Sequence, residues 1–481
     1  MTTIGSGEHG AGARTRLAAV LDRRGVSVEQ LSKRCDVAAA PLERLRLGTA
    51  EGIRFDTVVA LTRELDCAVD DLFDRSGGVP VTGVRDRPRT TCRVPQRWLL
   101  VLGASVVSLV VVWVLTAVVS SVNPVDFLVY RYGAAAASAG EDIYRQNLGG
   151  PMMPPGGLPF TYTPFAALVL LPTTLLEPTV AYLLWSWMTM AVLTGVIWSC
   201  TPAGPARVRR VVVSLAVSGA SIVVASHIIF GQINVPLMAL CLVDVLRREG
   251  GGRARWLPSG ALVGVAAAIK LTPALFLLYF AVTRQWSRLA WGAGIAAACT
   301  AIGAVVFPEA SGTFFRDTVW HLSDRVDLGG LFATSGNNSI QGALAFAGAP
   351  SVLAVLAAAG AGAAGLAAAV VAHRRADELS ATVIVGLTAC LVSPVSWLHH
   401  WVYLVPALVL LSTRPSRSAR RFVAVAAVVL LCTGPNLGDV VLGMQLAPLQ
   451  PIGLLLRESL VILGAVAVCM LARRPAPAAG A

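Results

Sequence analysis

The segment Trp98-Leu-Leu-Val-Leu-Gly-Ala-Ser-Val-Val-Ser-Leu-Val-Val-Val-Trp-Val-Leu-Thr-Ala-Val-Val-Ser-Ser-Val122 decides the class of this protein. It carries no charged side chain and is long enough to cross a bilayer, which takes about 20 apolar residues as a helix. Over all 481 residues, 55% are hydrophobic and only 14% are charged, which excludes an ordinary soluble domain. The polar residues 1–97 are too long and too polar for a cleavable signal peptide. The sequence therefore predicts an integral membrane protein.

Further apolar runs predict an all-α, polytopic bundle of about ten to twelve transmembrane helices. After the first, the predicted crossings are 179–200, 211–229, 234–246, 289–307, 350–372, 379–395, 401–412, 422–433 and 451–472. Two stretches do not fit straight spans: Pro164 and Pro172 interrupt residues 160–177, and Lys270-Leu-Thr-Pro273 interrupts residues 257–283. Broken helices are tolerated in membranes where they line a cavity. We expect residues 257–283 to form two short helices that meet at a polar apex.

The net charge of +12 comes mainly from arginines in alternate links between the apolar runs. These clusters lie in residues 85–97, 207–210, 247–255, 284–288, 374–375, 414–421 and 473–474. By the positive-inside rule, such links are cytoplasmic, as is the N-terminus. The long loops 123–158 and 308–349 then lie outside, where we expect the function, because loops commonly carry functional residues. None of the nine cysteines falls in a predicted outer loop, so no disulfide framework is expected.

Residues 14–75 predict a small cytoplasmic helical domain, followed by a basic linker at 76–97 and the membrane domain at 98–472. An apolar stripe that includes Leu17 and Leu21 precedes the cap-like Ser27, and the segment from Pro41 to Gly48 suits a further helix. The order resembles the Cro/C1-type helix-turn-helix family. Ala38-Ala-Ala-Pro41 stands where that family usually reads bases, and alanine has no side-chain donors or acceptors for base edges. We favour docking to a cytoplasmic protein or a vestigial module, with DNA as the alternative partner.

Uncommon polar side chains gather at the predicted outer ends of the membrane helices. Asp126 follows the first span, and Tyr162 stands in Phe160-Thr-Tyr-Thr-Pro-Phe165 at the start of the next apolar run. The other members of this set are Gln232, Asn234, Lys270, Arg325, Asn337, Asn338, Gln341, His399 and His400. An ionisable group at the lip of a span is costly unless water or a reaction uses it. The pattern predicts a functional site at the outer boundary between membrane and water.

Five ordered motifs over about residues 98–472 resemble the glycosyltransferase 87 family, whose members are integral-membrane enzymes of the GT-C class. The motifs are the region around Asp126, Phe160-Thr-Tyr-Thr-Pro-Phe165, Gly231-Gln-Ile-Asn234, Lys270-Leu-Thr-Pro273, and Ser393-Pro-Val-Ser-Trp397 through His399-His-Trp401. The resemblance implies transfer of a sugar from a polyprenyl-phosphate donor, typically mannose and in some members of the family arabinofuranose. It implies a lipoglycan or polysaccharide acceptor outside the inner membrane of a bacterium, with membrane lipid around the protein.

The resemblance implies that Asp126 is the catalytic base and that His399 and His400 belong to the active site. A base must take the proton of the acceptor hydroxyl, and donor groups must stabilise the leaving phosphate. For the phosphate the candidates are Lys270, Arg325, His399 and His400. For the sugar and acceptor they are Tyr162, Gln232, Asn234, Asn337, Asn338 and Gln341. Inversion is expected, with neither a metal nor a cofactor.

Structural interpretations compete with these roles. Asp126 has the residue type of a helix cap, Lys270 can extend its chain toward water, and the two histidines can be interfacial packing residues. Gln232 and Asn234 can simply satisfy the main chain at a helix break. A metal site built on Asp126 and the histidines lacks a ligand spacing such as His-x-x-x-His.

Two other functions compete with the enzyme. A transporter or flippase for lipid-linked sugars predicts inverted repeats, which the sequence does not contain. A membrane-bound transcription regulator requires base-reading residues at 38–46 and leaves Asp126 and the long loops without a purpose. The enzyme interpretation explains both Asp126 and the long loops.

Overall fold

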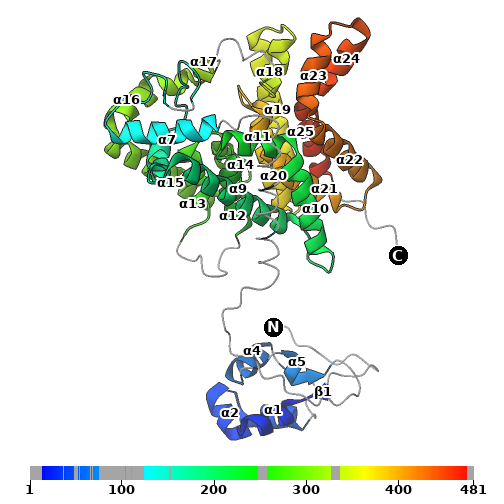
Figure 1. Ribbon diagram of the computed structural model, residues 1–481. Coiled ribbons are helices and arrows are strands. Elements are labelled where there is room, and N and C mark those ends of the chain that lie inside the picture. The colour runs from blue at the N-terminus through cyan, green and yellow to red at the C-terminus, as the bar shows by residue number, and fades with distance from the viewer. Residues whose placement is uncertain are drawn as a thin grey trace. The chain divides into compact units, whose positions relative to one another are not determined.

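The computed structural model describes residues 14–35, 37–47, 53, 55–65, 67, 69–74, 103, 110, 124–150, 153–247, 257–326 and 336–473. The chain divides into two compact units, Met1–Arg93 and Val94–Ala481. Both are helical (Figure 1), which confirms the predicted all-α class. The first predicted span, residues 98–122, lies outside the described residues apart from 103 and 110.

The N-terminal unit is a bundle of short helices around a small apolar core. Its elements are β1 (Arg14–Thr15), α1 (Leu17–Arg24), α2 (Val28–Cys35), α3 (Ala39–Arg46), α4 (Phe55–Glu64), α5 (Val69–Leu72) and β2 (Phe73–Asp74). Leu17, Leu31 and Leu61 are fully buried. Ser27 and Gln30 exchange side-chain to main-chain hydrogen bonds at the start of α2, as the cap-like Ser27 predicts. The antiparallel pair of β1 and β2 has no counterpart in the prediction, and Gly48 lies outside the described residues.

Among the described residues of the second unit, three helices are long and apolar enough to cross a membrane as single straight rods. They are α9 (Pro178–Cys200), α15 (Trp286–Val306) and α19 (Ser351–His373). Each coincides with a predicted crossing. Five shorter apolar segments accompany them: α8 and η1 (Pro164–Leu170 and Leu171–Thr174), α12 (Asn234–Leu246), η2 and α14 (Thr272–Ala274 and Leu275–Val282), α20 (Glu378–Val392), and η5 and α21 (Leu398–Tyr403 and Leu404–Ser412).

Three further apolar stretches of the described residues are bent. Two of the bends interrupt predicted straight spans, 211–229 and 451–472, and the third lies at the end of the predicted span 422–433. The first pair is α10 (Arg207–Ala220) with α11 (Ile222–Phe230), and the second is α22 (Arg417–Leu431) with α23 (Gly434–Gly443). The third is η6 (Ala447–Leu449) and α24 (Gln450–Arg457) with α25 (Ser459–Ala472). Their bend angles are 66°, 62° and 52°. At the first bend, Ser221 has extended backbone and its hydroxyl caps α11, so a local hydrogen bond replaces the continuous helix.

The interrupted stretch 257–283 forms two short helices, as predicted. Helix α13 (Ala261–Ile269) ends where Lys270 adopts extended backbone, and η2 and α14 continue from Thr272. At the opposite end of α13, the buried Asp244 carboxylate accepts the main-chain N–H groups of Gly260 and Val263 at 3.0 and 2.9 Å. This cap fixes the start of the helix that carries Lys270 at its end.

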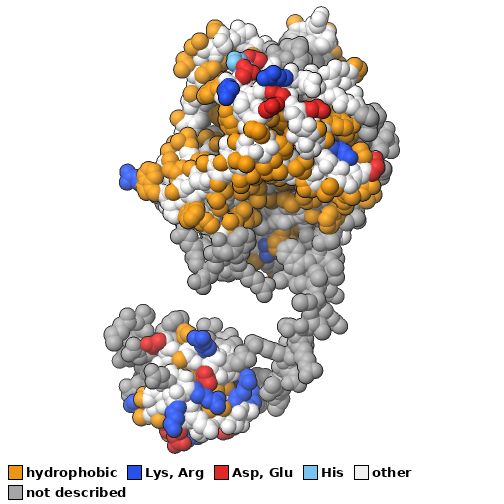
Figure 2. Space-filling model, turned by 90° about the vertical axis from the view of Figure 1, so that its left-hand side faces the viewer, with side chains coloured by type: hydrophobic (Ala, Val, Ile, Leu, Met, Phe, Trp, Pro, Cys, Tyr) orange, Lys and Arg blue, Asp and Glu red, His pale blue; other side chains and the backbone are white. Residues whose placement is uncertain are grey.

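The two long loops of the sequence prediction contain helices. The described part of residues 123–158 holds α7 (Val125–Ser138), and residues 308–349 hold α16 (Pro308–Arg316), η3 (Thr318–Trp320), α17 (Leu322–Val326) and α18 (Ile340–Phe346). They were expected as loops because helices this short leave weak periodic signals. In Figure 1, α18, α23 and α24 lie together at one end of the bundle. Figure 2 shows a broad hydrophobic band on one face of this unit, with most charged side chains gathered beyond it.

Candidate functional site

Asp126 lies in the first turn of α7, which is not among the candidate membrane spans. Pro124 occupies the N-cap position of this helix, so Asp126 is not its N-cap. The side chain of Gln232 hydrogen-bonds the Asp126 carboxylate. Burial raises the pKa of Asp126 to about 6, although this hydrogen bond and the charge of Lys270 act in the opposite direction. A carboxylate with such a pKa is ionised near neutral pH and is basic enough to take a proton.

The turn between α11 and α12 brings Gln232 to Asp126. Gly231 adopts φ 70°, and a Cβ at this position would lie 2.5 Å from Phe127 Cβ, so the turn needs glycine to pack against α7. Gln232 is 3% exposed. Its Oε1 accepts hydrogen bonds from Tyr130 Oη at 3.0 Å and Asn234 Nδ2 at 3.3 Å. The Gln232 oxygen is thus used, which leaves its amide N–H groups for Asp126.

Tyr162 joins this group from the segment that precedes α8. Its hydroxyl lies 2.8 Å from the Tyr130 hydroxyl, and its main-chain oxygen accepts the Tyr144 hydroxyl at 2.7 Å. The next residue, Thr163, caps α8 and hydrogen-bonds the main-chain oxygen of Ala268 in α13. These bonds bring the aromatic segment to the end of α13, where Lys270 Nζ lies 5.3 Å from the centroid of the Tyr162 ring.

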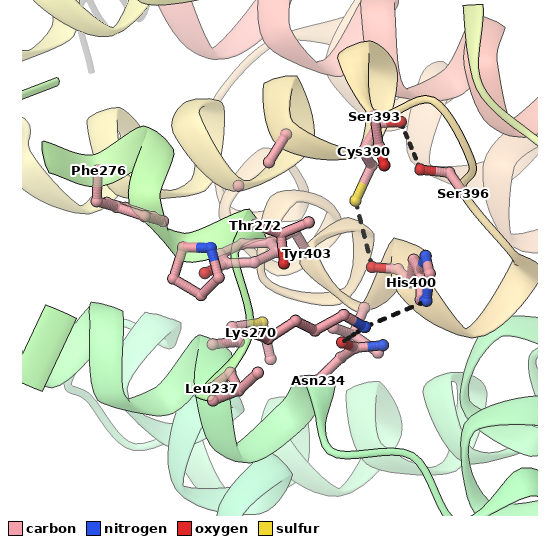
Figure 3. Close-up of a pocket in the computed structure, with 15 residues that line it drawn as sticks. Asn234, Leu237, Lys270, Thr272, Phe276, Cys390, Ser393, Ser396, His400 and Tyr403 are labelled. Atoms are coloured by element: carbon pink, nitrogen blue, oxygen red, sulfur yellow. Dashed lines mark hydrogen bonds between the residues drawn. The ribbon is translucent and has the colours of Figure 1, made fainter. Parts of the chain in front are cut away.

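Lys270 connects the turn to His400 of η5. Its Nζ donates a 2.9 Å hydrogen bond to Asn234 Oδ1 and lies 3.4 Å from His400 Nε2. Figure 3 shows Lys270 extended toward both residues. His400 Nδ1 accepts the Trp397 main-chain N–H at 3.3 Å, so the proton of a neutral ring is on Nε2. Lys270 and His400 then present two donors to one point, which suits an anionic oxygen between them.

His399 lies beside this pair and is 6% exposed. Its ring centroid is 5.3 Å from that of Phe230 and 4.9 Å from that of His400. Neither of its ring nitrogens has a hydrogen-bond partner among the described residues. Its main-chain oxygen accepts Asn234 Nδ2 at 3.3 Å. A buried imidazole without partners is unfavourable unless a ligand satisfies it.

The cavity next to Lys270 has one polar end and apolar walls. Asn234, Lys270 and His400 line the polar end, with Ser393 and Ser396 nearby. The apolar walls are formed by Leu237, Met238, Phe276, Ala389, Val402 and Tyr403. Such a cavity suits a ligand with a charged head and a hydrocarbon chain.

The sequence model of Glycosyltransferase family 87 matches residues 160–394, which include the motifs of Tyr162, Gln232 and Lys270. A relative that is 33% identical aligns over 64% of this chain and 75% of its own length. This chain belongs to glycosyltransferase family 87. It is therefore a membrane glycosyltransferase, and the predicted family is confirmed.

Three relatives of known name illustrate the similarity. The first is the polyprenol-phosphate-mannose-dependent alpha-(1-2)-phosphatidylinositol mannoside mannosyltransferase of Mycobacterium tuberculosis described above. The second is the enzyme of the same name from Mycolicibacterium smegmatis, which is 35% identical over 59% of this chain and 69% of its own length. The third is a phosphatidylinositol pentamannoside mannosyltransferase of Mycobacterium tuberculosis, which has the same donor in its name. It is 34% identical over 61% of this chain and 68% of its own length. No solved structure matches this chain. The model of the Cro/C1-type HTH DNA-binding domain matches residues 16–77.

Four predicted site residues of this family 87 chain donate side-chain hydrogen bonds to main-chain groups. Asn337 Nδ2 donates to Pro394 O at 2.9 Å, and Asn337 Oδ1 accepts the Ser396 N–H at 3.1 Å. The remaining hydrogen bonds of this kind are Asn338 Nδ2 to Gly336 O, Gln341 Nε2 to Val392 O and Arg325 Nη1 to Tyr144 O. The side chains of Asn337 and Gln341 thus bond to residues 392–396, which lead to His399 and His400. Asn338 contacts the same segment through its main-chain N–H, which donates to Ser396 O at 2.6 Å.

Sequence reasoning missed His227, which contacts the same turn from α11. It is fully buried, and its Nε2 accepts the Val235 main-chain N–H at 3.1 Å. The available signal was an ionisable residue inside the apolar segment Ile222–Phe230, four residues before Gly231. Such residues in membrane helices are functional candidates by default.

Proposed function

We propose that this chain is a mannosyltransferase that moves mannose from a polyprenyl-phosphate donor to a hydroxyl of a cell-envelope glycolipid. The names of the relatives support both substrates, because they specify polyprenol-phosphate-mannose and phosphatidylinositol mannosides. The cavity with a cationic end and apolar walls supports a lipid phosphate as the donor. The domains that we propose are the cytoplasmic helical domain at 14–75, the basic linker at 76–97 and the membrane glycosyltransferase domain at 98–472.

One observation carries the proposal: a network of polar contacts runs from Asp126 through Gln232 and Asn234 to Lys270 and His400. It puts a potential base at one end and two hydrogen-bond donors at the other. Displacement of a phosphate by a hydroxyl needs both functions at once. Tyr130 and Tyr162 brace the middle of the network.

In the proposed reaction, Asp126 takes the proton from the acceptor hydroxyl. The hydroxyl oxygen forms a bond to the anomeric carbon, and the bond between that carbon and the phosphate oxygen breaks. The leaving polyprenyl phosphate keeps the electron pair, and Lys270 and His400 stabilise its charge. Attack from the face opposite the phosphate inverts the anomeric carbon, so a β-linked donor gives an α-linked product. The relatives have alpha linkages in their names.

The remaining predicted residues take different parts in this proposal. His399, whose two ring nitrogens have no hydrogen-bond partner in the described part of the chain and lie next to His400, is available to the phosphate or to a sugar hydroxyl. Asn337 and Gln341 support the loop that leads to the histidines through their side chains, and Asn338 supports it through its main-chain N–H. Arg325 secures the main chain at Tyr144.

The proposed orientation puts the N-terminus in the cytoplasm and Asp126 outside the inner membrane, as the arginine clusters predict. A membrane-impermeant thiol reagent tests it in a background without the exposed Cys432 and Cys469. Cysteines at the exposed Arg145 and His321 should react in intact cells. Cysteines at 209 and 417 should react only after lysis. The reverse result would overturn the orientation.

Purified protein in liposomes tests the function. Radiolabelled polyprenyl-phosphate mannose and polyprenyl-phosphate arabinofuranose are offered separately, each with phosphatidylinositol mannosides as acceptor. We expect label from the mannose donor to enter the glycolipid in an α-linkage. Transfer from the arabinofuranose donor alone would overturn the sugar assignment. Movement of intact donor across the liposome membrane without transfer would instead support a flippase.

For the N-terminal domain we propose docking to a cytoplasmic protein. Ala38, Ala39 and Ala40 are all exposed where α3 begins, and they offer no side-chain groups for base edges. The purified domain should bind DNA only in a salt-sensitive, sequence-indifferent way. A thousandfold preference for one DNA sequence over random DNA would contradict this proposal.

A further inference from the structure

His227 braces the turn that carries Gln232 and Asn234 from both sides. Its main-chain oxygen accepts the N–H of Gln232 at 3.0 Å, just after α11 ends. Its side chain reaches across the turn, where Nε2 accepts the N–H of Val235 at 3.1 Å. The same residue therefore holds the end of one helix and the beginning of the next.

The side-chain contact does the work of a helix cap. The first N–H groups of a helix have no partner within that helix, and a polar N-cap residue usually accepts one of them. In α12 the N-cap position is occupied by Ile233, which makes no side-chain cap bond. The imidazole of His227 supplies the missing acceptor from the preceding helix.

The packing around His227 leaves this arrangement little freedom. The residue is fully buried, and Tyr182 Oη donates to the main-chain oxygen of the neighbouring Ile228 at 2.8 Å. Gly231 packs against Phe127 with no room for a Cβ. A shift at His227 must therefore move the turn itself.

The turn determines where the two ends of the polar network lie. Gln232 contacts Asp126, and Asn234 contacts Lys270 at 2.9 Å. We infer that His227 is a positioning residue for the transfer reaction: its Nε2 cap on α12 holds the turn that separates the base from the phosphate-binding cation. This inference rests on the proposed function. His227 itself acts only through Gln232 and Asn234.

The chemistry of the cap predicts which substitutions preserve it. Because Nε2 accepts, the proton of the neutral ring is on Nδ1. Glutamine places its amide oxygen at about the reach of Nε2, whereas the oxygen of asparagine stops at about the reach of Nδ1. His227→Gln should therefore retain the cap, and His227→Asn should lose it. The same two substitutions at the exposed His321, whose side chain contacts Asp317 of its own segment, are the matched controls.

Steady-state kinetics of the four purified variants test the inference, using whichever donor the wild-type protein accepts. We expect His227→Asn to lower kcat at least about tenfold, because small misplacement of reacting groups is costly. Its donor KM should change less than about threefold, and His227→Gln and both His321 variants should stay within about threefold of wild type in kcat. Equal kcat values for His227→Asn and His227→Gln would overturn the positioning role, whether both are active or both inactive.

A spectroscopic measurement separates this inference from the proposed reaction. The chain has six histidines, so ¹⁵N-histidine NMR can resolve their protonation states. We expect a neutral ring protonated on Nδ1 in the wild-type protein, and its signals should disappear in His227→Gln. If that ring is absent from the wild type, the cap is wrong even if transfer occurs. If it is present and no donor is used, the proposed function fails instead.

Discussion

Two clusters of buried or half-buried amides lie near the histidines of η5, and they differ in what their side chains contact. Gln232 and Asn234 bond mainly to other side chains, namely Tyr130, Lys270 and each other. Asn234 has one main-chain partner as well, the oxygen of His399. Asn337 and Gln341 bond to main-chain groups at residues 392–396. Side-chain networks can rearrange around a ligand. An amide that satisfies buried main-chain groups cannot leave them without cost.

The difference separates two kinds of contribution to one site. The first cluster connects a base to a cation, and its members can face substrate. The second holds the segment that presents His399 and His400 and determines whether they are in place. Substitutions in the first cluster should change turnover or affinity, and substitutions in the second should change stability. The predictions below test this division.

The largest effect is expected from Asp126→Asn. The substitution preserves shape but removes the base, so kcat should fall about a hundredfold or more. Donor binding should remain, because the phosphate is held at Lys270. Asp142→Asn is the matched control, since Asp142 hydrogen-bonds Thr313 and the main-chain N–H of Tyr144 and pairs with Arg145. Turnover of Asp126→Asn near that of the control would remove Asp126 as the base.

Lys270→Gln should act mainly on donor affinity. It removes a charged donor that faces the proposed phosphate, which is worth about tenfold to a hundredfold in donor KM. Competition by polyprenyl phosphate should weaken in parallel. Arg325→Gln provides the comparison, because Arg325 contacts the main chain of Tyr144 and should alter donor KM much less. Equal effects of both substitutions would contradict the assignment of the phosphate to Lys270.

Asn337→Ala should affect stability more than chemistry. It removes hydrogen bonds to Pro394 O and the Ser396 N–H, each worth about 1 kcal/mol and more where a buried partner is left unsatisfied. The thermal unfolding temperature should fall, while molecules that stay folded keep kcat within several-fold. An unchanged unfolding temperature with lost donor binding would move Asn337 into the ligand-facing cluster.

Removal of residues 1–80 should have the smallest effect. The truncation keeps the basic residues from Arg85 to Arg97 that set orientation, and every member of the polar network belongs to the second unit. Specific activity should remain within a few-fold of the full chain. Loss of activity in a correctly inserted, folded protein would show that the N-terminal domain participates in transfer.

The sequence was sufficient to predict the helical class, the straight spans and the break at Lys270, because length, apolarity and proline leave strong local signals. It also predicted most of the network, since polar residues are rare in this chain's apolar background. The bends at Ser221 and Glu458 were missed, because serine and a charged residue are compatible with a helix and the break depends on tertiary contacts.

Residue type could not distinguish Asn337 from Asn234. Both are amides near the predicted outer ends of helices, and only the partner, a main-chain group or Lys270, separates them. His227 was missed because its own sequence neighbourhood does not show its partner. Its role depends on a contact with Val235 across a turn, which no single-residue pattern shows.

The pH dependence of kcat/KM tests most directly whether one end of the network is a base and the other a cation. Burial raises the pKa of Asp126 to about 6, and Lys270 opposes that rise. Only the ionised carboxylate accepts the proton, so the rate should fall tenfold per pH unit as the pH drops below about 6. In Lys270→Gln the acid limb should move to higher pH, because the opposing charge is gone. A rate that stays flat to pH 4.5 in folded protein, or an acid limb that Lys270→Gln leaves in place, would contradict the account.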